Sequence, residues 1–180
     1  MSKPFMTRTH IHRVAVQFGD CDPAGIVFFP NFSRWMDQSS LAFFMAFFMA
    51  CGVPPWRELV KTRGIIGTPL LEIHTRFIRP ATYGETIDVH TCVEAWMAKT
   101  FRHRHRVLRG DTLLCEGTEV RAFCIRDPAD PDRIRAIPVP ADIQALCTTE
   151  QARLVVATLQ AALKRSTIQL AAAALLNRSR

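Results

Sequence analysis

The sequence predicts an α+β fold in which a curled antiparallel sheet wraps around one long central helix. Two observations lead to this fold. Residues 31–50 are largely apolar with helical character, and long segments between 68 and 126 alternate between apolar and polar side chains. A helix that is apolar on every side must be enclosed by other structure. Long alternating segments separated by short turns are typical of antiparallel strands, so the sheet is expected to enclose the helix.

A first strand and a tight turn precede the helix. Residues 12–18 alternate weakly, with Val14, Val16 and Phe18 on one side, which predicts a strand. The segment 22–25 reads Asp-Pro-Ala-Gly, and residues of these types favour a turn.

The central helix is predicted over residues 31–50. Pro30 suits a first helical position and Asn31 suits a cap. The second half, Phe43–Ala50, is a tandem repeat of Phe-Phe-Met-Ala. Gly52 and the two prolines after it predict the end of the helix.

The remaining elements follow from the change of period. A short helix is expected from about residue 56 to 61, closed by Gly64. The strands are predicted at about 68–79, 86–97, 101–109 and 112–126, joined as an antiparallel meander. A polar loop at 129–133 and a short helix at 141–147 complete this part. The alanine-rich residues 149–180 differ in character, so we predict one domain over 1–148 and a helical C-terminal extension of unknown role over 149–180.

Composition limits the class of partner and the compartment. The net charge is +7, which calls for an anionic partner such as nucleic acid, an acidic membrane surface or a phosphate-bearing small molecule. The six cysteines show no C-x-x-C spacing, which is typical of reduced thiols in a cytoplasmic protein. The N-terminus lacks the apolar region of a signal peptide. The most apolar run, 41–51, is about half of the ~20 residues that a membrane helix needs, so we expect a core helix.

The turn before the helix suggests hydrolytic chemistry. Asp20 and Asp22 lie two residues apart, just before the helix N-terminus. Backbone amides at a helix N-terminus carry partial positive charge and can polarise a carbonyl oxygen. A carboxylate beside such amides is an arrangement that hydrolases use. The same residue types also form plain structural turns.

Several blocks between residues 10 and 148 together match a known family. They are Phe18–Val27, Pro30–Asn31, Arg34–Asp37, Cys51–Arg57, Arg63–Pro69, Trp96 with Lys99, and Arg133–Asp142. In these blocks the chain resembles the hotdog-fold acyl-CoA thioesterases, and specifically the 4-hydroxybenzoyl-CoA thioesterase group of bacterial aromatic degradation. The residues from 149 onward have no counterpart in that pattern.

The resemblance implies a catalytic pair. Asp22 would be the catalytic carboxylate, acting as nucleophile or as general base for water. The backbone N–H of Phe29, at the helix N-terminus, would polarise the thioester carbonyl. Asp20 is expected to form the turn or to support Asp22.

The resemblance also implies residues that bind substrate. Asp37 would meet the far end of an aromatic acyl group, Trp56 would flank it, and Thr68 would lie near the pantetheine arm. Without the resemblance, Asp37 also fits a surface carboxylate paired with Arg34, and Trp56 fits an ordinary core residue.

The nucleotide part of the substrate is assigned in the same way. Lys99, Arg133 and Arg135 would face the phosphates of an acyl-CoA substrate, which also accounts for the basic charge. The resemblance further implies a homotetramer built as a dimer of hotdog dimers, with the active site at the dimer interface. It implies no cofactor, no metal, no nucleic-acid partner and no membrane association.

The chain departs from the family pattern in three places. Phe29 stands where the group usually has tyrosine, and Met97-Ala98 precede Lys99 where more basic residues are usual. The Phe-Phe-Met-Ala repeat adds four residues to the helix, or about 6 Å of rise and ~40° of net rotation. Because this insertion lies between Asp37 and Trp56, it bears on Trp56 and leaves Asp22 untouched.

Other functions also fit parts of the sequence. Phe29 favours a short-chain or general acyl-CoA thioesterase of the same fold. A hotdog dehydratase would want a histidine at the helix entry, and residues 18–50 have none. A non-catalytic CoA or nucleic-acid binding module fits the charge but leaves Asp22 unexplained. In the segment 102–107, Arg-His-Arg-His-Arg-Val, a third metal ligand and stacking aromatics are both missing from the pattern, so we interpret it as a solvated basic face.

Overall fold

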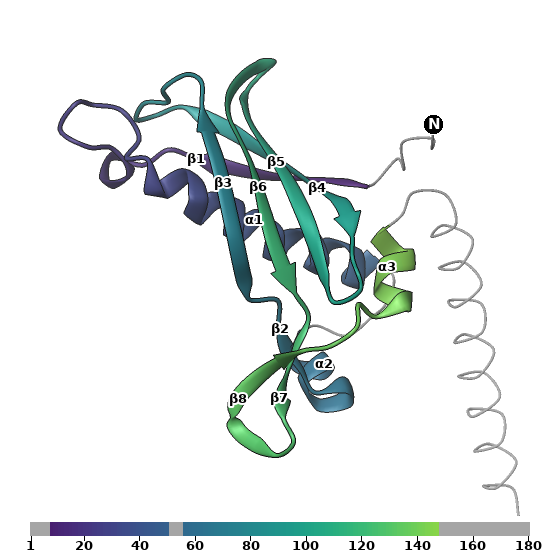
Figure 1. The fold of residues 1–180 in the computed structure, drawn as a ribbon. Helices are drawn as coiled ribbons and strands as arrows, with labels where there is room; N and C mark the ends of the chain where they lie inside the picture. The colour runs from purple at the N-terminus through teal and green to yellow at the C-terminus, as the bar shows by residue number, and fades with distance from the viewer. Residues whose placement is uncertain (1–7, 51–55, 148–180) are drawn as a thin grey trace, which may run out of the picture.

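The structure is a computed structural model, and it describes residues 8–50 and 56–147. The prediction of a curled antiparallel sheet around a long central helix is confirmed (Figure 1). The elements in chain order are β1 (Thr9–Ala15), a 3-10 turn (Phe18–Asp20), α1 (Pro30–Ala50), α2 (Trp56–Arg63), β2 (Ile65–Gly67), β3 (Leu70–Phe77), β4 (Thr86–Trp96), β5 (Thr100–Arg109), β6 (Thr112–Ala122), β7 (Cys124–Asp127), β8 (Asp130–Ala136) and α3 (Ala141–Cys147). The extension 149–180 and the predicted helix end at Gly52 lie outside the described residues.

The large sheet has five antiparallel strands in the order β1-β4-β5-β6-β3, and α1 runs along one face of it (Figure 1). The predicted meander is therefore correct for β4-β5-β6 and wrong for β3, which pairs with β6 instead of β4. The reason lies in residues 81–85, whose backbone pairs with the segment before α1. Ala81 accepts from the N–H of Val27, and Gly84 donates to Val16. The chain therefore crosses from β3, at one edge of the sheet, to β4, which lies beside β1 at the other edge.

A second, three-stranded sheet has the order β2-β7-β8. It lies with α2 at one end of the large sheet (Figure 1). The predicted single strand 112–126 is wrong, because the chain leaves β6 at Phe123 and starts β7 in the second sheet. The predicted loop 129–133 is also wrong beyond Ala129, because most of it belongs to β8, which pairs with β7.

The ends of the N-terminal elements differ slightly from prediction. Helix α1 begins at Pro30 as expected, but Asn31 is inside the helix and is not its cap. Strand β1 ends at Ala15, and Phe18 is 79% exposed instead of sharing the buried side of Val16. The end of α2 is as expected, with Gly64 at φ 66° donating to the carbonyl of Val60.

The core consists of two hydrophobic clusters along α1 with polar residues between them. Met36 belongs to the cluster near the helix start and Phe43 to the cluster near α2 and α3. Between them, Ser39 and Ser40 are buried and face polar residues of the sheet. Helix and sheet pack closely at Gly117, where an added Cβ would lie 2.9 Å from the Met36 sulfur.

The cysteines and helices of the described residues match two expectations from composition: reduced thiols and a core helix. Among the described residues, Cys21, Cys92, Cys115, Cys124 and Cys147 form no disulfide, and all but Cys21 are buried. Burial raises the pKa of the Cys115 thiol to about 12, which leaves it protonated and unreactive. None of the helices in the described ranges is long and apolar enough to span a membrane.

Candidate active site

Asp20 is committed to building the acidic turn. Its carboxylate accepts from the N–H of Gln17 at 2.8 Å and pairs with Arg34 at 2.5 Å. Its carbonyl accepts from the N–H of Phe28 at 2.9 Å and from Nδ2 of Asn31 at 2.8 Å. The turn is thereby fastened to the first turn of α1, and Arg34 is unavailable to Asp37.

Asp22 is held differently and keeps one oxygen available. Its Oδ1 accepts from the N–H of Ala24 at 2.8 Å, and its own N–H donates to the carbonyl of Ile26 at 2.9 Å. Gly25, at φ 77°, closes the turn in a backbone conformation that suits glycine. No hydrogen bond reaches Oδ2 from any residue of the described ranges. The Asp22 carboxylate is therefore half-buried, with Oδ1 held by the turn and Oδ2 available to a ligand.

Phe29 occupies the N-terminal end of α1. Its carbonyl accepts from the N–H of Phe32 at 3.2 Å, whereas within 8–50 and 56–147 its own N–H has no acceptor. Such an amide at a helix N-terminus can donate to a ligand oxygen and carries the positive end of the helix dipole. The side chain is 61% exposed. Phe29 can therefore present both its amide and its aromatic ring to a ligand.

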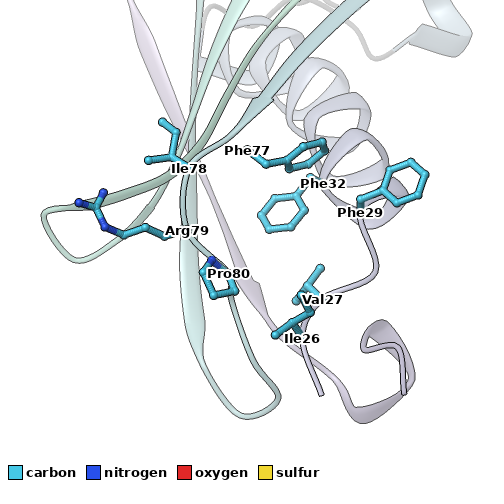
Figure 2. A pocket seen from close by; sticks show the side chains of 8 residues that line it. All are labelled: Ile26, Val27, Phe29, Phe32, Phe77, Ile78, Arg79 and Pro80. Atoms are coloured by element: carbon cyan, nitrogen blue, oxygen red, sulfur yellow. The ribbon is translucent and has the colours of Figure 1, made fainter. Parts of the chain in front are cut away.

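An apolar hollow of about 340 Å³ adjoins this amide, and we call it the Phe29 hollow. Its lining residues are Ile26, Val27, Phe29, Phe32, Phe77, Ile78, Arg79 and Pro80. Figure 2 shows the rings of Phe29, Phe32 and Phe77 close together, while the side chain of Arg79 points away from them. The Phe77 ring centroid lies 6.3 Å from that of Phe29 and 5.6 Å from that of Phe32.

A second hollow, of about 370 Å³, brings together the three residues predicted to contact the acyl and pantetheine parts, and we call it the Asp37 hollow. Its lining residues are Asp37, Leu41, Trp56, Ile66, Gly67, Thr68, Pro69 and Arg121. Asp37 pairs through Oδ1 with Arg121 at 2.6 Å and not with Arg34. Trp56 packs against Phe44, with ring centroids 6.2 Å apart, and also lines the hollow.

Arg121 is a site residue that the sequence did not single out. It lies near the end of β6 and is only 6% exposed, yet it reaches Asp37, Glu119 and the carbonyl of Thr68. In the sequence it is one of several arginines in alternating strands. The structure places it on the inward side of the strand, where a charged side chain is rarely buried without a partner. Strand alternation alone does not show which side faces inward.

The predicted solvated basic face on 102–107 is correct for the arginines and wrong for the histidines. His103 and His105 are 0% exposed because the inward side of β5 faces α1. Their ligand atoms and those of buried Glu119 lie within 4.8 Å of one another, a composition that could hold a metal ion. Glu119 is already neutralised by Arg121 at 2.8 Å, and that guanidinium opposes a cation at the same place.

The three residues assigned to the phosphates lie outside both hollows. Lys99 is exposed in the β4–β5 turn, and Arg133 and Arg135 are exposed on β8. The turn and the chain after β8 are joined where the N–H of Val139 donates to the carbonyl of Ala98 at 3.0 Å.

The two hollows lie at opposite ends of β3. Phe77 and Ile78, at its C-terminal end, line the Phe29 hollow, and Thr68 and Pro69 come just before its start. β3 is also an edge strand of the large sheet (Figure 1). It exposes Leu70, Leu71, Ile73 and Phe77 by 40–59%.

Comparison with known proteins gives the enzyme class. Residues 16–146 match the Thioesterase-like superfamily. The chain therefore belongs to this superfamily and is a thioester hydrolase.

Individual relatives are similar over most of the chain. A 4-hydroxybenzoyl-CoA thioesterase of Pseudomonas sp. (strain CBS-3) is 42% identical over 148 residues, covering 79% of this chain and all of the relative. The solved structure of a mutant 4-hydroxybenzoyl-CoA thioesterase complexed with 4-hydroxybenzoyl-CoA is 39% identical, with a TM-score of 0.69 over 78% of this chain and 99% of that one. A gentisyl-coenzyme A thioesterase is 26% identical, with a TM-score of 0.61 over 77% and 98%. The expected hotdog fold and thioesterase class are confirmed.

Proposed function

We propose that this thioesterase hydrolyses an aromatic acyl-CoA of the 4-hydroxybenzoyl or benzoyl type to the free acid and CoA. The proposal rests on two groups of the segment before α1: an available carboxylate oxygen on Asp22 and an available N–H on Phe29, a residue that also lines an apolar hollow. The similarity to 4-hydroxybenzoyl-CoA thioesterases supports the choice of acyl group.

The proposed chemistry needs only these two groups and water. The Phe29 N–H donates to the thioester oxygen, where negative charge develops as the carbonyl carbon is attacked. Asp22 either attacks that carbon itself or removes a proton from the attacking water. A C–O bond forms and the C–S bond breaks. On the general-base route, the CoA sulfur takes up the proton that Asp22 removed from water. On the direct route, the sulfur leaves as a thiolate and takes its proton from water. On the direct route, water then hydrolyses the mixed anhydride and releases Asp22.

We propose that two copies of the chain pair through β3 and that such dimers associate further into a tetramer. An exposed apolar edge strand is normally covered, and two copies related by a two-fold axis would extend the sheet. In antiparallel pairing, the start of one β3 lies beside the end of the other. The Asp37 hollow of one copy then adjoins the Phe29 hollow of its partner, so each complete site contains Asp22 from one copy and Asp37, Trp56 and Thr68 from the other.

The phosphates of CoA are assigned to Lys99, Arg133 and Arg135. Arg135 lies opposite Ile125, and Ile125 lies opposite Ile65. Two strand spacings of about 4.8 Å therefore separate Arg135 from β2, whose last residue, Gly67, lines the Asp37 hollow. This supports a path for the CoA arm from the hollow towards β8.

A hydrolysis panel tests the acyl group. We expect the highest kcat/KM with 4-hydroxybenzoyl-CoA, then benzoyl-CoA, and far lower values with phenylacetyl-CoA and short aliphatic acyl-CoA thioesters. A higher kcat/KM for the aliphatic thioesters would favour the alternative, a short-chain or general acyl-CoA thioesterase. Phe29 supports that alternative, because its side chain brings no hydroxyl to the hollow.

Mixing two inactive variants tests the shared site. Asp22→Asn removes the carboxylate, and Thr68→Trp fills the Asp37 hollow. If each site takes one half from each copy, unfolding and refolding the two together restores one good site per mixed dimer. Random pairing then gives about a quarter of the wild-type activity. Activity no higher than that of the separately refolded variants would show that each chain carries a whole site.

A further inference from the structure

Arg121 connects the Asp37 hollow to the centre of the molecule. Its Nη2 donates to Oδ1 of Asp37 at 2.6 Å, its Nη1 to the carbonyl of Thr68 at 3.0 Å, and its Nε to Oε2 of Glu119 at 2.8 Å. The partners lie on α1, on the segment before β3, and on β6 itself. One nearly buried side chain therefore holds two groups of the hollow in a fixed relation.

Glu119 keeps Arg121 in place from the inside. It is 1% exposed, accepts from Ser40 Oγ at 2.8 Å, and lies 3.3 Å from Nε2 of His105. Burial alone would raise the pKa of Glu119, but His105 and Arg121 outweigh burial and lower it to about 2. Glu119 is therefore ionised, and removing Arg121 would leave this buried carboxylate without its guanidinium counter-charge.

Asp37, by contrast, has Arg121 as its one side-chain partner among residues 8–50 and 56–147. Its side chain is 64% exposed, and Oδ1 is engaged by the guanidinium. For Oδ2, the described part of the chain supplies no donor. Without Arg121, an exposed aspartate on a helix would sample several rotamers in water. With Arg121, one carboxylate oxygen is held at the hollow as a hydrogen-bond acceptor.

The three linked residues also carry a net negative charge, with Asp37 and Arg121 in the wall of the hollow and Glu119 behind them. Asp37 and Glu119 contribute two negative charges, and Arg121 contributes one positive charge, so the three together carry one negative charge. A neutral hydroxyl on the acyl group can donate to this acceptor, an unsubstituted ring cannot, and an anionic ring is repelled.

We propose that Arg121, anchored by Glu119, is a positioning residue that determines acyl specificity by fixing Asp37 as an acceptor for a neutral hydroxyl. The inference rests on the proposed function, since it assumes that the acyl group enters the Asp37 hollow. It predicts the substrate order 4-hydroxybenzoyl, benzoyl, 4-carboxybenzoyl.

The test compares kcat/KM for these three CoA thioesters in the full-length enzyme. Asp37→Ala should reduce the preference for 4-hydroxybenzoyl over benzoyl by about tenfold to a hundredfold, as expected for losing a charged hydrogen bond. Arg121→Met should reduce the same ratio to a similar extent. The double variant should show no further loss, because the two residues act as one unit. Arg109→Met is the matched control: it removes an arginine that pairs with Glu85 at 2.6 Å, outside both hollows, and it should leave the ratio unchanged.

Two further variants keep the test decisive if Arg121→Met does not fold. The pair Glu119→Gln with Arg121→Met removes both buried charges, and it should lose the hydroxyl preference as well. Glu119→Gln alone makes the three-residue group neutral, so discrimination against 4-carboxybenzoyl-CoA should weaken relative to benzoyl-CoA.

The outcomes separate the two proposals. If Asp37→Ala abolishes the hydroxyl preference but both Arg121 variants retain it, Arg121 is only structural and this inference is wrong. If Asp37→Ala also leaves the ratio unchanged, the acyl group does not reach Asp37, and both the inference and the proposed acyl group fail.

Discussion

The two hollows at the ends of β3 are of similar size but are built in different ways. The Phe29 hollow is apolar and depends on local chain geometry: the acidic turn, the start of α1 and the end of β3. The Asp37 hollow has a carboxylate and a guanidinium in its wall, and these depend on Glu119 in the interior. The first contains Phe29, whose amide we propose acts with Asp22 in a reaction common to all thioesters. The second offers a charge pattern that can distinguish one acyl group from another. In the proposed function, hydrolysis and acyl selection therefore depend on separate parts of the molecule.

The largest effect is expected from removing the proposed catalytic carboxylate in the turn before α1. Asp22→Asn should lower kcat by at least ~10³ for every acyl-CoA, the scale of losing a catalytic group, while binding of the thioester survives. Single-turnover kinetics and equilibrium binding measure the two quantities. Asp20→Asn is the contrast: since Asp20 is engaged with Arg34 and Gln17, it should lower stability more than kcat. A turnover near the wild-type value for Asp22→Asn would remove Asp22 from the mechanism.

A smaller and uniform effect is expected at the basic residues beyond the Asp37 hollow. Charge reversal at Lys99, Arg133 or Arg135 should raise KM for all acyl-CoA substrates by the same factor, because the phosphates are remote from the acyl group. The measurement is KM across the substrate panel at fixed ionic strength. A changed order of acyl preference would place these residues next to the acyl group instead.

The smallest effect concerns the buried polar residues beneath the Asp37 hollow. Burial, followed by the charge of His105, lowers the pKa of His103 well below its ordinary value of 6.5. The unfolded chain gains a proton near pH 6.5 and the folded chain does not, so the free energy of unfolding falls as the pH drops below about 6.5. The slope approaches about 1.4 kcal/mol per pH unit for one proton.

His103→Gln should remove this contribution. Urea unfolding between pH 7.5 and 5.5, at one protein concentration, would show a shallower decline than in the wild type. His12→Gln, on the outer strand β1, is the control. An equally steep decline in the His103 variant would show that the ring takes up its proton in the folded state.

The parts of the site that sequence could predict are those set by neighbours along the chain. Asp22 and the Phe29 amide lie within eight residues, and turn and helix-start preferences place them. The association of Asp37 with Trp56 and Thr68 came from the resemblance, and the structure brings the three together.

What sequence could not predict depends on long-range pairing. Arg121 reaches the hollow only because β6 lies beside β3, and a meander would have put β4 there. His103 and His105 alternate with three arginines, so the pattern gave a period of two but not which side faces α1. β8 was missed because its polar, proline-containing sequence resembles a loop, and only its pairing with β7 makes it a strand.

Gly117 has a consequence for how the two hollows are related. A methyl group at this position would meet the Met36 sulfur at 2.9 Å and the carbonyl oxygen of His74 at 2.8 Å. Met36 belongs to α1, which carries the Phe29 amide at its start and Asp37 one residue after Met36. His74 belongs to β3, which runs from one hollow to the other. A side chain at this one point on β6 would therefore press against both the helix and the edge strand, and so disturb two elements that each extend to both hollows.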